Sequence, residues 1–164
     1  MGLWYSGTKI TIKPSWGLNY KCNIQQDGNW SFIISIPKAI PGKYIEHSMY
    51  LESNDTKISL KKILFGEVWL TSGQSNMDMS MQPFLPWHLG VLDHEYEIKH
   101  SANKFIRLIK IPKTTSDELM SNTGGNWLGC DTINVKDFSG VSFYFAKKLQ
   151  NKLKIPIGII QSAY

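Results

Sequence analysis

The amino-acid sequence predicts an α/β fold preceded by a small β segment, and three observations support this prediction. Residues 1–62 contain short runs of β-forming residues separated by turn signals. From Val68 onward, apolar runs typical of strands alternate with segments of helical periodicity. The first of these strands ends in a polar, glycine-containing turn. Such alternation favours a parallel sheet with right-handed crossovers and flanking helices. We therefore expect two parts, residues 1–62 and residues 63–164.

The first part is expected to contain five short strands. They are predicted at residues 8–13, 20–25, 30–36, 44–51 and 56–60. Asp27-Gly28 is a strong hairpin signal, and Pro41-Gly42 and Ser53-Asn54-Asp55 form further turns. Strands of this length and spacing are typical of a small antiparallel β-sandwich. Three tryptophans either pack in its core or form a face on which sugar rings stack, and both interpretations stay open for Trp4, Trp16 and Trp30.

The second part begins with a strand, a tight turn and the start of a helix. The apolar run from Phe65 to Thr71 predicts a buried strand, which the small polar residues 72–76 interrupt. Gly73 can adopt backbone angles that other residues avoid, and Asp78 is an acidic residue in an expected first helical turn. This layout presents the Ser75 hydroxyl at the carboxyl end of a strand, where open α/β folds bind their ligands.

Ser75 has two interpretations at this point. As a nucleophile, it would lie where the N–H groups and partial positive charge of a helix amino terminus stabilise an oxyanion. As an N-cap, it would only accept a hydrogen bond from the helix backbone, which is a common role for serine. Its neighbours Gln74 and Asn76 either support the oxyanion or the substrate, or simply shape the turn.

The remaining elements are read from periodicity. A short exposed helix is expected at residues 92–101, a strand at 105–111, a long helix at 139–154 and a strand at 155–160. A surface loop is expected around residues 83–87. The long helix is expected to start at an Asp137 or Ser139 cap and to lie on the sheet through a stripe of Val141, Phe145, Leu149 and Leu153. The run Gly124-Gly125-Asn126 is either an oxyanion loop or a plain connection.

Several segments resemble one protein family in the same order. They are residues 66–77, 127–130, 137–146 and 155–160. Together they resemble the sialate O-acetylesterases, a carbohydrate-esterase branch of the SGNH hydrolases, over roughly residues 58–164. The resemblance implies a partial SGNH-type (flavodoxin-like) sheet and a serine esterase that removes O-acetyl groups from sugars. It places Ser75 at the position of the family nucleophile and implies no metal and no cofactor.

The later catalytic segments of that family have no counterpart here. In the family, a Gly-Gly-Thr segment follows the strand that here ends at residues 161–164, and Asn and Asp/His segments come further on. The resemblance therefore implies the amino-terminal portion of an esterase, incomplete and inactive by itself. No base is identifiable among the histidines His47, His88, His94 and His100, of which His88 is the strongest candidate.

The composition argues against several classes of protein. The 164 residues are 42% hydrophobic and 19% charged, a normal balance for a soluble globular chain. The net charge of +5 comes from scattered lysines, with Arg107 as the only arginine, which argues against nucleic-acid binding. No apolar run approaches the ~20 residues of a membrane span. The first residues lack the pattern of a signal peptide, whereas members of the family are often periplasmic or secreted. Cys22 and Cys130 form no metal or redox motif and are expected to be free thiols.

Two functions from different classes remain. The first is a serine esterase that acts on an acetylated carbohydrate through Ser75. The second is a non-catalytic module or inactive remnant, in which the β segment binds a glycan. In either case, a sheet without strands beyond residues 157–161 would have an uncovered apolar edge and face. We expect the chain to associate with itself through that surface.

Overall fold

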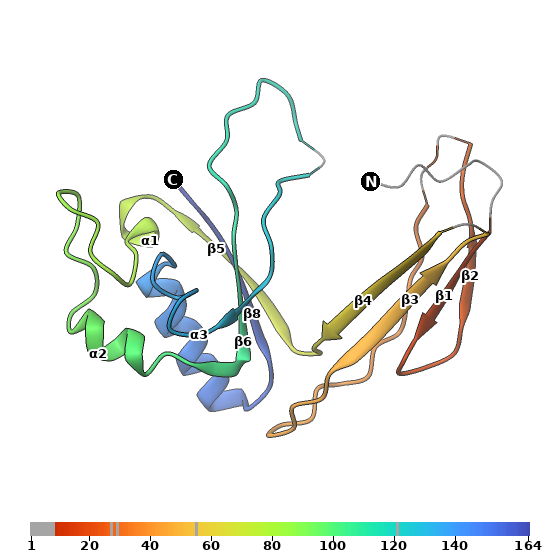
Figure 1. The fold of residues 1–164 in the computed structure, drawn as a ribbon, viewed down its shortest axis with the longest axis horizontal. Coiled ribbons are helices and arrows are strands. Elements are labelled where there is room, and N and C mark those ends of the chain that lie inside the picture. Colours follow the sequence, from red (N-terminus) through yellow and green to blue (C-terminus); the bar gives the residue numbers. More distant parts are fainter. Residues whose placement is uncertain (1–8, 27, 29, 55, 121) are drawn as a thin grey trace. The chain divides into compact units, whose positions relative to one another are not determined.

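The computed structural model describes residues 9–26, 28, 30–54, 56–120 and 122–164 (Figure 1). Trp4 and the turn residues Asp27 and Asp55 lie outside the described residues. The chain divides into two compact units. The first comes from the ranges Met1–Lys38 and Ile45–Phe65, and the second from Ala39–Tyr44 and Gly66–Tyr164.

The first unit contains one antiparallel sheet. Its strands are β1 (Lys9–Pro14), β2 (Tyr20–Asn23), β3 (His47–Glu52) and β4 (Lys57–Ile63), in the order β2-β1-β3-β4. These strands confirm four of the five predicted from the sequence. Their buried core consists of Ile10, Ile12, Ile24 and Leu51.

The predicted sandwich is wrong for the described residues, because they form a single sheet and residues 30–36 form no strand. The edge strands of this sheet are β2 and β4, and residues 30–36 form a backbone ladder with neither. The segment is nevertheless alternately half-buried and exposed: Trp30 and Phe32 pack against the core, whereas Ile33 is 96% exposed. This alternation produced the strand-like pattern, but the contacts that create it are made by side chains and not by a backbone ladder.

The described tryptophans of the first unit support the core interpretation. Trp30 stacks on Phe32 with ring centroids 5.7 Å apart. Trp16 meets Phe65 edge to face at 4.9 Å, and its indole N–H donates to the Ser35 carbonyl at 3.1 Å. Both indoles are half-buried by neighbouring side chains, so neither is presented as an open platform for a sugar ring.

The second unit confirms the predicted α/β class. Its elements are β5 (Glu67–Gly73), α1 (Ser75–Asp78), α2 (His94–Lys99), β6 (Asn103–Lys110), β7 (Leu128–Cys130), α3 (Gly140–Leu153) and β8 (Ile157–Ala163). The sheet order is β5-β8-β6-β7. β8 is parallel to both β5 and β6, whereas the short β7 is antiparallel to β6. β7 was not predicted, because three residues in a polar, glycine-rich region carry no strand periodicity.

A short segment that precedes β3 in the chain packs within the second unit. Gly42 N donates to the Lys154 carbonyl at 2.7 Å, and the Tyr44 hydroxyl accepts from Arg107 Nη2 at 2.9 Å. The Tyr44 ring also meets Phe105 edge to face, with centroids 5.5 Å apart. Residues 39–44 therefore interrupt the first unit along the chain, a feature for which the sequence carried no signal.

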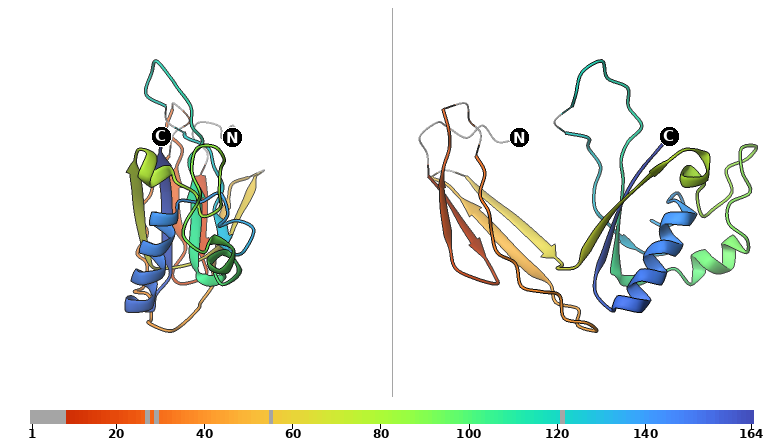
Figure 2. Two further views of the ribbon diagram at one scale, coloured as in Figure 1. Left: turned by 90° about the vertical axis from the view of Figure 1, so that its left-hand side faces the viewer. Right: turned by 180° about the vertical axis from the view of Figure 1, so that it is seen from behind.

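The core of the second unit lies between the sheet and α3. Ile106, Leu108, Ile157 and Ile159 occupy alternating positions of β6 and β8 and pack in one cluster with residues of α3 and with Ile98 of α2. The described helices lie on this same side of the sheet (Figures 1 and 2). None of them combines the length and the apolar character that a membrane span requires.

The predicted apolar stripe of α3 is wrong in its first half. The buried face contains Phe143 and Ala146, whereas Val141 and Phe145 are 37% and 38% exposed. At about 100° per residue, a stripe with a strict spacing of four drifts by ~40° at each step. Leu149 and Leu153 consequently reach the core and the earlier two members do not. The predicted cap is confirmed, because Ser139 Oγ accepts from Ser142 N at 3.2 Å.

β5 was predicted to be buried, and its central residues are exposed. Val68 and Leu70 are 62% and 66% exposed because β5 is an edge strand. Trp69 and Thr71 face α3, through a ring contact with Phe145 and a hydrogen bond with Ser142. Val68 and Leu70 therefore point to the opposite face of the sheet, which no described helix covers. The expected open edge thus lies at β5, and not at the last strand, β8, which is in the interior.

Candidate active site

The turn after β5 depends on a glycine. Gly73 has φ +152°, and a Cβ atom built there would lie 2.7 Å from Met77 Cγ. The Gly73 carbonyl accepts a hydrogen bond from Tyr164 N at 3.0 Å, which ties the turn to the end of β8. The prediction that Gly73 adopts unusual backbone angles is confirmed.

Ser75 is the first residue of α1, and Gln74 occupies the N-cap position. The interpretation of Ser75 as an N-cap is therefore wrong. Its side chain is exposed, and among the described residues its hydroxyl has no hydrogen-bond partner. Because α1 is a single turn of 4 residues, few peptide dipoles are aligned, and the partial charge at its start is smaller than the sequence suggested.

Gln74 and Asn76 flank the serine with exposed side chains. The carbonyl of Gln74 accepts hydrogen bonds from Met77 N and Asp78 N, both at 2.9 Å, so its backbone shapes the turn. No described partner holds either side-chain amide. Both amides are therefore free to contact a ligand beside Ser75.

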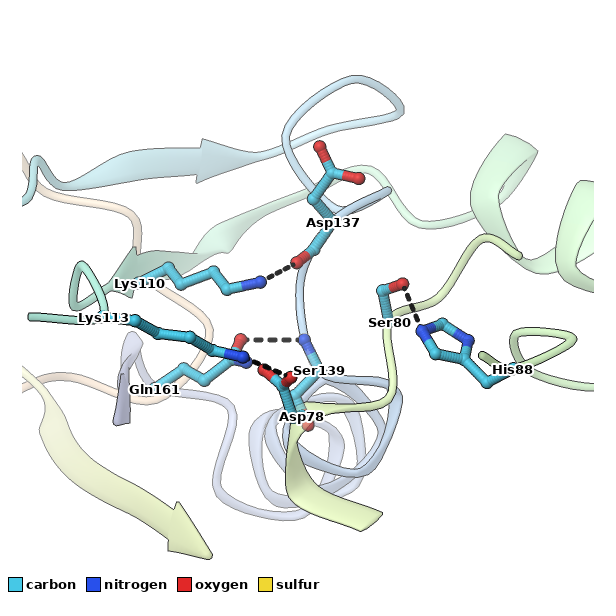
Figure 3. A network of polar contacts seen from close by, with 8 residues as sticks. All are labelled: Asp78, Ser80, His88, Lys110, Lys113, Asp137, Ser139 and Gln161. Carbon is cyan, nitrogen blue, oxygen red and sulfur yellow. Dashed lines mark hydrogen bonds and ion pairs between the residues drawn. The ribbon is translucent and has the colours of Figure 1, made fainter. Parts of the chain in front are cut away.

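A cluster of polar side chains lies next to α1 (Figure 3). Lys113 Nζ lies 2.6 Å from Asp78 Oδ2 at the end of α1. Met79, the residue after α1, accepts a hydrogen bond from Gly140 N at 2.9 Å. Gln161 is 1% exposed, and its Oε1 accepts from Ser139 N at 2.9 Å. These bonds connect α1, the start of α3 and β8 at the carboxyl ends of the parallel strands.

A cavity of about 910 Å³ lies at the same end of the sheet. Its lining includes Gly73 and Tyr164 from the strand ends and Lys113 from the loop after β6. Most of the other lining side chains carry a hydroxyl or an amide, namely Ser72, Thr114, Thr115, Ser116, Asn122, Thr123 and Ser162. Ser75 follows the rim residue Gly73 by two positions and does not itself line the cavity.

The Gly124-Gly125 run forms part of the loop beside this cavity. Gly125 has φ +93°, and a Cβ atom there would lie 3.1 Å from the Lys110 carbonyl. Gly124 has φ +71° and lines the cavity. These glycines allow the loop to approach β6 closely, which favours the interpretation as a connection.

His88 is paired with Ser80 and not with Ser75 (Figure 3). His88 Nδ1 accepts a hydrogen bond from Gly90 N at 3.1 Å, so the neutral ring carries its proton on Nε2. Nε2 lies 3.4 Å from Ser80 Oγ, which itself donates to the Gln82 carbonyl at 2.9 Å. In this arrangement the His88 ring donates toward Ser80 and does not act as a base for the Ser80 hydroxyl.

The other histidines are also engaged or located elsewhere. His100 Nδ1 lies 2.7 Å from the Tyr96 carbonyl. His94 lines a second cavity of about 520 Å³ beside α2. His47 belongs to the first unit, where it stacks on Phe65 at 4.3 Å. In the described part of the chain, no histidine forms a hydrogen bond with Ser75.

Neither cysteine has the environment of a reactive thiol. Both are free, as predicted. Burial, assisted by the charge of Asp131, raises the pKa of Cys130 to about 11, and burial also raises the pKa of Cys22. The Cys130 thiol donates to the Ser101 carbonyl at 3.3 Å. Within the described ranges, no cluster of three or more His, Cys, Asp or Glu side chains is arranged to hold a metal ion.

Comparison with curated proteins identifies relatives of one kind. Over 123 residues, 70% of this chain, the sequence is 27% identical to the sialate O-acetylesterase of Rattus norvegicus and 26% identical to that of Homo sapiens. The chain resembles the sialate O-acetylesterases. The matched part is 21% of the rat protein and 22% of the human one, so the chain spans about a fifth of the length of these relatives. No family model matches the chain.

The fold of the chain is similar to that of a solved structure. A carbohydrate acetylesterase from Xanthomonas citri superimposes with a TM-score of 0.85 and 23% sequence identity. The match covers 99% of this chain and 35% of the bacterial one. It supports a mixed α/β fold that contains two sheets.

Proposed function

We propose that the chain carries the nucleophile region of a serine esterase that removes O-acetyl groups from carbohydrates. The observation that carries the proposal is the exposed Ser75, held by a glycine turn at the carboxyl end of a parallel strand beside a polar cavity. The relatives named sialate O-acetylesterase support the same class of reaction. On this proposal, residues 63–164 belong to an SGNH-type hydrolase domain.

The proposed chemistry is acyl transfer through Ser75. Its Oγ loses its proton and attacks the acetyl carbonyl carbon, the ester C–O bond breaks, and the sugar oxygen takes up a proton and leaves as an alcohol. Hydrolysis of the acetyl-serine by water then releases acetate. The side-chain amides of Gln74 and Asn76 are the proposed donors to the oxyanion or the substrate. No metal or cofactor takes part in these steps.

The cavity has the chemistry of a site for the sugar portion of the substrate. Hydroxyl and amide side chains can donate to and accept from the hydroxyls of a polyol. Tyr164 and Met120 add apolar surface, which suits the carbon faces of a sugar ring. An acetylated carbohydrate is therefore the proposed substrate class.

A serine nucleophile needs a base, and no described side chain fills that role for Ser75. We therefore expect the chain by itself to acetylate Ser75 slowly and to hydrolyse p-nitrophenyl acetate no faster than its Ser75→Ala variant. Serine hydrolases that lose their base retain only a small residue of catalysis. Turnover by the unmodified chain that depends on Ser75 would contradict this expectation, and His88, His94 and His100 would then be tested by substitution.

The experiment that tests the nucleophile is acetyl trapping. The chain is incubated with p-nitrophenyl acetate at mildly alkaline pH, and acetylated peptides are quantified by mass spectrometry. We expect acetyl-Ser75 to form faster than acetyl-Ser72. Ser72 serves as the control, because it is also exposed and lies near the end of β5, three positions before Ser75. Equal acetylation of Ser72 and Ser75 would contradict the proposal that Ser75 is the nucleophile.

A non-catalytic glycan-binding module is the second candidate, and the absence of a described base at Ser75 favours it. The polar cavity does not include Ser75, so it can bind a sugar without the serine. Binding of an O-acetylated sialoside, measured by NMR titration, distinguishes the two functions. Binding that persists in Ser75→Ala, with no acetyl transfer by the parent, supports the module.

A further inference from the structure

The single-turn helix α1 is tied to the loop after β6 by one ion pair. Lys113 Nζ lies 2.6 Å from Asp78 Oδ2 (Figure 3). Asp78 is the last residue of α1 and follows Ser75 by three positions, so the two residues are neighbours on one side of the turn. Movement of the Asp78 carboxylate is therefore transmitted to the turn that presents Ser75.

Lys113 also contacts the residue that holds the other side of this turn. Its ammonium lies 5.6 Å from the centre of the Tyr164 ring, and Tyr164 N donates to the Gly73 carbonyl at 3.0 Å. Lys113 and Tyr164 both line the polar cavity. One lysine thus connects residues before and after Ser75 with the wall of the cavity.

The burial of Asp78 explains why a cation is needed there. Asp78 Oδ1 is out of contact with solvent and has no hydrogen-bond partner in the described structure. A carboxylate with one buried oxygen is destabilised unless a neighbouring cation compensates its charge. Lys113 is the cation that makes the described ion pair with Asp78.

The same pair contributes little to global stability. Its side chains are 43% exposed for Lys113 and 28% exposed for Asp78, and ion pairs of such exposure are weak because water and salt screen them. The principal effect of the pair is therefore local, on the orientation and order of α1.

We propose that Asp78 and Lys113 are positioning residues, which hold Ser75 in the orientation for attack and couple that orientation to the cavity wall. The inference rests on the proposed function, since it concerns how the nucleophile is presented. Neither residue touches the ester, and both act through Ser75. A polyol that enters the cavity meets the Lys113 loop and, through Asp78, acts on the serine turn.

The test compares Lys113→Met with the matched control Lys147→Met. Lys147 makes an ion pair with Glu97 at 3.2 Å, and these side chains are 37% and 24% exposed. Lys147 does not line the cavity and has no described interaction with α1. The two variants thus remove similar ion pairs from the same unit.

Two quantities are measured on the full 164-residue chain. The first is amide hydrogen exchange of residues 77–79, whose N–H groups close the α1 turn. The second is the rate of Ser75 acetylation by p-nitrophenyl acetate. In Lys113→Met we expect exchange to rise and acetylation to fall by about fivefold each, the upper range for a partly exposed pair. Lys147→Met is expected to leave both within twofold of the parent.

A conservative variant separates positioning from general loss of structure. Lys113→Arg keeps the charge and is expected to retain the parent acetylation rate within twofold. Lys113→Gln replaces the methionine variant if the latter does not fold. Equal effects of Lys113→Met and Lys147→Met, or faster exchange without slower acetylation, overturn the proposal. A parent chain that acetylates Ser75 no faster than Ser72 overturns the proposed function instead, and the exchange comparison still decides the role of the pair.

Discussion

Gly73→Ala is a substitution that the serine turn should accept poorly. The residue has φ +152°, a backbone conformation that residues with a Cβ atom rarely adopt. The added methyl group would lie 2.7 Å from Met77 Cγ and 3.2 Å from Met77 Cβ. Both effects act within the turn that presents Ser75.

The magnitude follows from these two effects. An unfavourable backbone conformation costs ~1–3 kcal/mol. A methyl group forced against a packed side chain adds ~1–3 kcal/mol, less whatever the Met77 side chain recovers by moving. We expect a loss of about 3 kcal/mol in the free energy of unfolding of the second unit, which corresponds to a fall of roughly 10–20 °C in its Tm.

Calorimetry of the parent, Gly73→Ala and the control Gly129→Ala measures this loss. A Cβ atom at Gly129 would meet only Arg107 Nη1 at 3.9 Å, so we expect a change below ~1 kcal/mol there. Adding Met77→Ala to Gly73→Ala removes the Cγ overlap, and comparison of this double variant with Met77→Ala alone gives the cost that remains. A Gly73→Ala protein as stable as the Gly129→Ala protein would refute the reasoning about the turn.

Three further predictions follow from the packing of the second unit. Phe143→Ala should destabilise it by ~3–5 kcal/mol because Phe143 is buried, whereas Phe145→Ala should cost about 1 kcal/mol. Equal losses of the two variants in urea unfolding would contradict the orientation of α3. The chain should self-associate at micromolar concentration through the exposed face of β5. The double variant Val68→Lys and Leu70→Lys should then shift it toward monomer in sedimentation velocity, and an unchanged distribution would contradict this surface as the contact. The raised pKa of Cys130 should make its thiol slow to react with a thiol reagent. Because the pKa is higher in the folded chain, the stabilisation is fully present below the ordinary pKa of 9.0 and should be lost as pH rises toward about 11. In Cys130→Ala, the free energy of unfolding should depend less on pH over this range.

The sequence predicted most elements because their signals are local. Strand β6 and helix α3 each have a long apolar pattern with a clear end, and the glycine turn at Gly73 is specified by a single residue type. Ser75 became a candidate in the same way, since a strand, a glycine turn and a helix start are adjacent in the chain, and the family resemblance then placed it at the position of the nucleophile. These features need no knowledge of distant contacts.

The errors arose where a distant contact decides the outcome. Residues 30–36 alternate like a strand, yet they cover a core that already has its sheet. β5 is apolar like an interior strand, yet it is an edge strand, because only one side of β5 is paired, with β8. The Lys113–Asp78 pair joins residues 35 positions apart, and no spacing rule connects a loop lysine with a helix-end aspartate.

The strand order of the second unit has a consequence for how the serine turn is assembled. β5 and β6 come first along the chain, but they are not neighbours, because β8 lies between them. The parallel pairing therefore begins only when residues 157–163 are inserted, and contacts of such long sequence separation form late. The bond from Tyr164 to Gly73 closes after that insertion. Until then, Ser75 is present but the turn that holds it is not formed, so the acetylation of Ser75 should be recovered last during refolding.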